Sequence, residues 1–284
     1  MGSCRKMWSL AVAAGLALSA LGQAWAQPAA KLPAAIKAKG EVIVGIEGLF
    51  APMEFKNPGS NDLIGFDVDL AKAIGKTLGV KVVFDDQKFD QLINSVTTQR
   101  VDFVISAISD SKTRQKTLDF IDYFKSGTQV YTTKAYAGSI KSLDDLSGKT
   151  FAIQASTDFF PTIQRWSKEA LEAKGKPGVT ILPVDSEANA RLQVVQGRAQ
   201  ASAISPEVLG WLMKQQPGKF VPVGEMLESN PYGIMFRKDD TGLRDAVHAA
   251  LAKLFKDGTY HKILAEWKLE LCAVDKPTIN GATQ

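Results

Sequence analysis

From residue 41 onward, apolar runs with β propensity alternate with segments whose apolar residues recur at the period of an α-helix. This alternation is typical of a largely parallel sheet covered by helices, so we expect an α/β fold. Strands are predicted at 42–46, 80–84, 103–105, 130–133, 151–153, 179–182, 201–204 and 233–236. Helices are predicted at 67–78, 89–98, 157–173, 187–196, 206–215, 243–255 and 260–267.

Residues that favour helix ends accompany several of these helices. Asp67 is expected to cap a helix, and Gly79 is expected to end the same helix in a left-handed turn. Ser205 precedes Pro206, which is the usual order of an N-cap and a first helical residue. The sequence therefore predicts where these two helices begin.

Residues 1–26 have the pattern of an export signal. Arg5 and Lys6 precede the apolar stretch 7–21, and a small-x-small site lies directly ahead of Gln27. The apolar stretch is shorter than the ~20 residues that a membrane span needs. We therefore expect cleavage before Gln27 and a free protein in the periplasm.

Composition excludes few partners. The formal net charge is +4 and falls by two when the signal is removed, which indicates neither nucleic acid nor an acidic surface as a partner. Cys4 lies in the signal, so Cys272 remains without an internal disulfide partner and either fills space or pairs between chains. His248 and His261 fall in the closing helices, where packing is a commoner role than metal binding. We expect neither a metal nor a cofactor.

The stretch SAISDSKTR, residues 106–114, is the main candidate for chemistry because it follows a buried strand with three serines and an arginine. It fits a hydroxyl-rich helix cap with Arg114 on a solvated face, or a corner that holds the negative end of a small ligand. Glu47 directly follows an apolar strand, where a carboxylate is costly unless it is exposed or paired, and this indicates an open cleft. Phe50 and Phe89, taken on their pattern alone, fit an ordinary core.

The ordered set of motifs resembles the family 3 extracytoplasmic solute-binding proteins, which feed polar amino acid ABC importers. The motifs are APMEF at 51–55, GFDVDLA at 65–71, FDQLI at 89–93, SAISDSKTRQK at 106–116, GR at 197–198, YGI at 232–234 and DGTY at 257–260.

The resemblance implies the two-lobed periplasmic binding protein type II fold with two hinge crossings, in which the lobes close over the ligand. It assigns 41–126 and 233–271 to the first lobe, 127–232 to the second, and 272–284 to a C-terminal tail. The turn-rich stretches 125–128 and 229–233 fall at the implied hinges.

The resemblance also implies a binding role for individual residues. Arg114 matches the arginine that takes the ligand α-carboxylate, and three neighbouring residues assist it with backbone and hydroxyl groups. Two phenylalanines match the positions that sandwich the ligand side chain, and an acidic residue matches the position that reads its far end. With the residues of the second lobe, the expected binding set is Glu47, Phe50, Phe89, Ser106, Ala107, Ser109, Arg114, Thr157, Asp158 and Ser205.

The second lobe departs from the family pattern at two places. Ser156, Thr157 and Asp158 stand where members usually carry Gly-Thr-Thr, so the Asp158 side chain is expected to point away or to serve another group. Ser205 stands where the family has the aspartate that takes the ligand α-ammonium. Either Glu47 or Asp158 supplies the missing charge, or the ligand lacks a standard α-amino group.

The expected function is a catalytically silent, monomeric binding component that captures an amino acid or small carboxylate for an ABC permease in the inner membrane. One alternative is a cyclohexadienyl dehydratase-like enzyme on the same scaffold, with Glu47 and Asp158 as the acid and base candidates. Another is a sensor module that presents its closed form to a receptor. The sequence leaves the identity of the ligand open.

Overall fold

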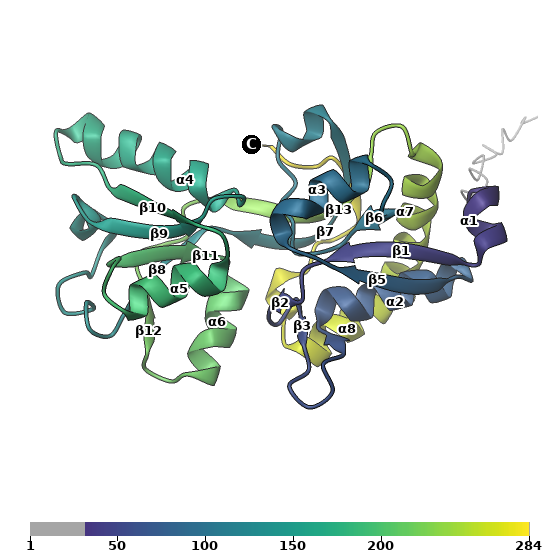
Figure 1. The fold of residues 1–284 in the computed structure, drawn as a ribbon, viewed down its shortest axis with the longest axis horizontal. Coiled ribbons are helices and arrows are strands. Elements are labelled where there is room, and N and C mark those ends of the chain that lie inside the picture. The colour runs from purple at the N-terminus through teal and green to yellow at the C-terminus, as the bar shows by residue number, and fades with distance from the viewer. Residues whose placement is uncertain (1–31, 284) are drawn as a thin grey trace, which may run out of the picture.

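The computed structural model of the chain describes residues 32–283, and the predicted export signal lies outside them. Two larger β-sheets form the centres of two lobes that lie side by side (Figure 1). Helices flank both sheets, which confirms the predicted α/β class. The expectation of a largely parallel sheet is wrong, because each sheet also contains antiparallel pairs and is mixed. None of the helices in the described part of the chain is long and apolar enough to cross a lipid bilayer.

The first lobe is built on a six-stranded sheet that is covered by helices. Its elements are α1 (Ala34–Lys39), β1 (Glu41–Ile46), α2 (Phe66–Leu78), β5 (Lys81–Asp86), α3 (Phe89–Thr97), β6 (Phe103–Val104), η1 (Arg114–Lys116), β7 (Leu118–Gly127), β13 (Ser229–Arg237), α7 (Thr241–Lys256), α8 (Thr259–Trp267), η5 (Glu270–Cys272) and β14 (Thr278–Ile279). The strand order is β14-β7-β13-β6-β1-β5, in which β1 pairs in parallel with β5 and β6. Alternate residues of β1, Val42, Val44 and Ile46, are buried, as a strand of period two requires.

A small second sheet extends the first lobe toward the other lobe. It consists of β2 (Leu49–Phe50), β3 (Glu54–Lys56) and β4 (Leu63–Ile64), each antiparallel to the next. The side chain of Phe50 packs against buried clusters of both lobes. This sheet therefore forms part of the surface at which the lobes meet.

The second lobe has a five-stranded sheet. Its elements are β8 (Gln129–Thr133), η2 (Leu143–Leu146), β9 (Thr150–Gln154), α4 (Phe159–Trp166), η3 (Ser167–Leu171), η4 (Glu172–Lys174), β10 (Thr180–Val184), α5 (Glu187–Val195), β11 (Ala201–Ile204), α6 (Pro206–Gln215) and β12 (Phe220–Pro222). The order is β10-β9-β11-β8-β12, with β9 parallel to both β10 and β11. Parallel pairing places the carboxyl ends of β9 and β11 at the same edge.

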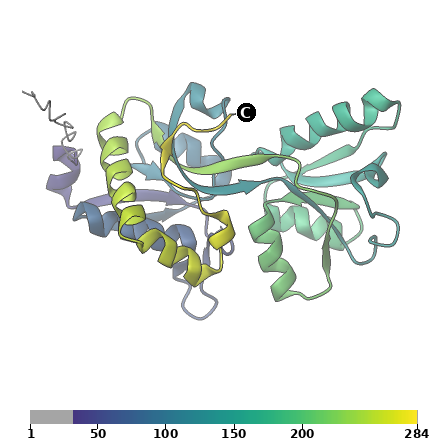
Figure 2. The ribbon, with the colours of Figure 1, turned by 180° about the vertical axis from the view of Figure 1, so that it is seen from behind.

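Two long strands connect the lobes. Strands β7 and β13 run antiparallel from Leu118 paired with Arg237 to Gly127 paired with Ser229, with an irregularity between Tyr232 and Gly233. Figure 2 shows both strands continuing from one lobe to the other. The turn-rich stretches at 125–128 and 229–233 therefore lie mostly in extended strands, and the exact lobe boundaries stay a prediction.

Several local predictions need correction. The residue that precedes α2 is Gly65, and Asp67 is not a cap because its side chain is buried and bonded to another segment. The helix predicted at 157–173 begins at Phe159 and changes to a π-helical turn after Trp166, although Pro161 does lie in its first turn. Ser205 does precede α6 with Pro206 as the first helical residue, but its side chain makes no capping bond.

Candidate functional site

A cavity lies between the two lobes. Most of its lining residues lie at or just after the carboxyl ends of β1, β6 and β9 or begin α3 and α4, as at the ligand sites of other open α/β sheets. Phe50 and Glu54 come from the small sheet of β2 and β3, and Arg114 begins η1. The lining consists of Glu47, Phe50, Glu54, Phe89, Ser106, Ala107, Ser109, Arg114, Gln154, Thr157, Asp158 and Phe159.

The structure brings all of the expected binding residues to this cavity except Ser205. Ser205 is wholly buried at the start of α6, and the residues that line the cavity do not include it. Its position therefore does not provide the described cavity with the contact that the family aspartate makes.

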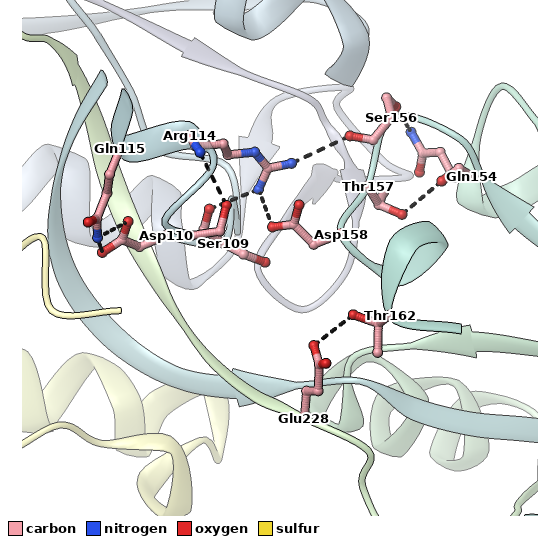
Figure 3. Close-up of polar contacts among 11 residues, drawn as sticks. Ser109, Asp110, Arg114, Gln115, Gln154, Ser156, Thr157, Asp158, Thr162 and Glu228 are labelled. Carbon is pink, nitrogen blue, oxygen red and sulfur yellow. Dashed lines mark hydrogen bonds and ion pairs between the residues drawn. The ribbon is translucent and has the colours of Figure 1, made fainter. Parts of the chain in front are cut away.

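The guanidinium of Arg114 joins the two lobes (Figure 3). Its Nη1 donates to the backbone oxygen of Ser109 at 2.8 Å and to Oδ2 of Asp158 at 2.7 Å. Its Nη2 lies 3.5 Å from the backbone oxygen of Ser156. Only 10% of the Arg114 side chain is exposed, so the interpretation that placed it on a solvated face is wrong.

Burial acts on both partners of this ion pair. It lowers the pKa of Arg114 and raises the pKa of Asp158, although in each case the opposite charge of the partner counteracts the shift. Asp158 therefore does serve another group, as expected, and that group is the guanidinium. A desolvated pair of this kind contributes little net stability, because the loss of hydration offsets most of the attraction.

Asp67 holds the loop that follows β6 and contains Ala107 by a hydrogen bond to its backbone. Ala107 adopts a left-handed backbone with φ of 44°, which is uncommon for a residue with a Cβ atom. Its N–H donates to Oδ2 of Asp67 at 2.8 Å, and the hydroxyl of Tyr123 donates to Oδ1 of the same carboxylate at 2.8 Å. Burial raises the pKa of Asp67 to about 7, against the lowering effect of these bonds. Asp67 thus fixes the loop conformation that presents the site residues.

Glu54 is a buried carboxyl that lines the cavity, and the sequence alone did not identify it as a site residue. The hydroxyl of Ser106 donates to Oε1 of Glu54 at 3.0 Å and accepts from the N–H of Glu47 at 3.0 Å. Burial, followed by the charge of Asp67, holds the pKa of Glu54 well above its usual range. This favours a protonated carboxyl, which can donate a hydrogen bond. An acid within the apolar motif APMEF was the signal that could have revealed it.

Glu47 lines the cavity together with three aromatic residues. Its Oε1 accepts from the backbone N–H of Phe89 at 3.2 Å, and burial raises its pKa. Phe50, Phe89 and Phe159 line the same cavity and supply apolar walls. Phe159 and Gln154 were also missed, although they flank the expected residues Thr157 and Asp158 closely in the sequence.

This arrangement is suited to holding a small polar molecule with an apolar part. The described lining contains one cationic side chain, Arg114, together with serine hydroxyls and aromatic walls. No group of three or more His, Cys, Asp and Glu within residues 32–283 is placed to hold a metal ion.

Comparison with known proteins places these features in a family context. The chain matches the bacterial extracellular solute-binding proteins, family 3, over residues 42–270. It is 29% identical over 251 residues to the arginine-binding protein ArgT of Corynebacterium glutamicum, a match that covers 88% of this chain and 82% of that protein.

Two solved structures are also similar. An ancestral arginine-binding protein bound to arginine is 36% identical with a TM-score of 0.72, and the match covers 80% of this chain and 98% of the other. An ancestral amino acid-binding protein, a precursor of cyclohexadienyl dehydratase, is 30% identical with a TM-score of 0.73, covering 82% of this chain and 97% of the other.

Proposed function

Because the chain belongs to the bacterial extracellular solute-binding proteins of family 3, we propose that it is the periplasmic binding component of an ABC importer. In this proposal residues 1–26 direct export and are then removed, and the mature chain acts as a monomer. It captures an amino acid or a related small carboxylate between its lobes and delivers it to a permease in the inner membrane. The arginine-binding relatives support an amino acid as the ligand class.

The position of Arg114 is the observation that carries this proposal. A guanidinium offers five N–H donors in a planar fork that fits a carboxylate with two parallel bonds. Here that fork lies at the interlobe cavity beside the hydroxyl-bearing residues Ser106 and Ser109. Closure of the lobes would exclude water from such contacts and strengthen them.

An enzymatic function is the second candidate, since one structural relative is a precursor of cyclohexadienyl dehydratase. Glu47 and Asp158 both line the cavity, and burial raises the pKa of each, which suits a proton donor. The ion pair with Arg114, however, favours the ionised form of Asp158 and opposes proton donation by it. We therefore propose a silent binder.

The test begins with the purified mature protein. Mass spectrometry under native conditions identifies any small molecule that co-purifies, and a thermal-shift panel compares L-amino acids with matching acids that lack the amine. We expect a small subset of carboxylates to raise the unfolding midpoint by mass action. If none of the carboxylates in the panel raises it, the proposed ligand class is wrong.

The same panel separates binding from catalysis. Each compound that raises the midpoint is incubated with the protein, and its concentration is followed by proton NMR. A silent binder leaves the compound unchanged at the amount added. Formation of more than one molecule of product per molecule of protein would establish an enzyme instead.

A further inference from the structure

We propose that Asp158 is a built-in competitor of the ligand carboxylate, and that it reduces affinity for carboxylates by occupying the guanidinium of Arg114. This inference rests on the proposed function and goes beyond it by assigning a specificity role to an acidic residue of the second lobe. Its consequence is that the acid disfavours a carboxylate relative to the corresponding carboxamide.

The hydrogen-bond geometry of Arg114 is the first argument. Nη1 has two hydrogens, and their acceptors are the backbone oxygen of Ser109 and Oδ2 of Asp158. A carboxylate that approaches the Nη1 and Nη2 edge with two parallel bonds needs a hydrogen of Nη1. It must therefore displace one of these two acceptors, and the Asp158 side chain is the one that can rotate away.

Charge is the second argument. A ligand carboxylate at the guanidinium would lie beside the Asp158 carboxylate, and two like charges at short range repel each other in a partly buried site. A carboxamide carries no net charge and avoids this repulsion. Asp158 therefore acts on the charge of the ligand end and not only on its shape.

The third argument is that the Asp158 side chain has space to rotate away from Arg114. Its side chain is 23% exposed, and it lines a neighbouring surface groove together with Ser111, Thr113 and Arg165 as well as the binding cavity. Rotation into that groove would restore hydration that the ion pair loses by burial. Arg165 lines this groove together with the carboxylates of Glu169 and Glu228, so the displaced side chain gains water and a nearby cation but also meets like charges.

The fourth argument concerns the lobes. Arg114 belongs to the first lobe, whereas Asp158 and Ser156 precede α4 in the second, so the ion pair is itself a contact between lobes. A ligand carboxylate that displaces Asp158 replaces this contact with its own. Asp158 thus contributes to closure through the same interaction that the ligand uses.

The experiment compares the mature protein with its Asp158→Asn variant. The side chain of Asp158 makes no capping bond to α4, so the variant is expected to keep the helix. The probes are L-arginine and L-argininamide, and L-glutamine and L-glutaminamide, with affinities measured by isothermal titration calorimetry. We expect the ratio of carboxylate to carboxamide affinity to rise about tenfold in Asp158→Asn, because the variant removes a contact between like charges at a site that is partly removed from water.

Glu47→Gln is the matched control, because it removes one negative charge from the same cavity without touching Arg114. Its carboxylate to carboxamide ratio should change less than that of Asp158→Asn. An unchanged or lower ratio in Asp158→Asn, with tight carboxylate binding by the wild type, overturns the inference and leaves the proposed function standing. An equal rise in both variants also overturns it, since the effect would then be general electrostatics.

A second measurement does not depend on any probe. Small-angle X-ray scattering of the protein without added ligand should give a larger radius of gyration for Asp158→Ala than for the wild type, because the variant loses the interlobe ion pair. Equal radii would reject the pair as an interlobe contact. If the radius rises while no carboxylate probe binds to any variant, the proposed ligand class fails and the interlobe role of Asp158 stands.

Discussion

Replacement of Arg114 by glutamine tests the binding site most directly, because it removes the guanidinium charge while it keeps a polar side chain. Two charge-assisted hydrogen bonds to a ligand carboxylate contribute roughly 1.5 to 3 kcal/mol each. Asp158 already uses one Nη1 hydrogen, so the net gain from a ligand should lie near the lower end of the summed range. We expect Arg114→Gln to lose about 3 kcal/mol of binding free energy, or roughly a hundredfold in affinity.

The stability of the unliganded protein should change less than the affinity. The variant loses the bond to the backbone oxygen of Ser109 and leaves the Asp158 carboxylate without its cation. Asp158 is partly exposed and can regain water, so we expect a loss of about 1 to 2 kcal/mol in unfolding free energy. The double variant Arg114→Gln with Asp158→Asn removes both charges together and should recover part of this loss.

The assay is a thermal shift with and without the tightest carboxylate found for the wild type, followed by calorimetry. Arg114→Gln should fold and show a small ligand-dependent rise in the midpoint, and the double variant should not regain tight binding. A rise as large as that of the wild type, in either variant, would refute the role of Arg114 as the carboxylate-binding residue.

Three further changes test other parts of the site. Burial raises the pKa of Asp67 from 3.8 to about 7, so its stabilising contribution is fully present below pH 3.8 and is lost as the pH rises through about 7. The free energy of unfolding, measured with urea, should therefore decline less over this pH range in Asp67→Asn than in the wild type. Parallel declines in the two proteins would reject the assignment. Burial holds the pKa of Glu54 well above its usual range and so favours its neutral form, which an amide resembles; Glu54→Gln should therefore bind the ligand nearly as well as the wild type, whereas a large loss in calorimetry would mean that the ionised form is needed. Phe50→Ala should lower the affinity and cost up to about 3 kcal/mol in unfolding free energy, because the ring packs against both lobes; unchanged values for both would exclude that packing role.

Much of the fold could be predicted because its signals are local. Strands such as β1 bury alternate apolar residues, and α6 begins with Ser205 and Pro206, so a short window of sequence contains the relevant preference. Strand β7 was missed because Asp119 and Asp122 interrupt its apolar pattern. Their charges find partners only in distant segments: Arg244 Nη1 lies 2.5 Å from Asp119, and the N–H of Gly281 lies 2.9 Å from Asp122.

The sequence by itself determined which short segments carry the candidate chemistry, since the serines, Arg114 and the residues near Asp158 lie at strand ends that face one cavity. It did not determine how the charges in those segments are compensated. Asp67 supports the binding loop instead of capping its helix, and Asp158 pairs with Arg114 from the opposite lobe. The tertiary structure decided both, because desolvation and ion pairing depend on groups that come together in space although they are far apart along the chain.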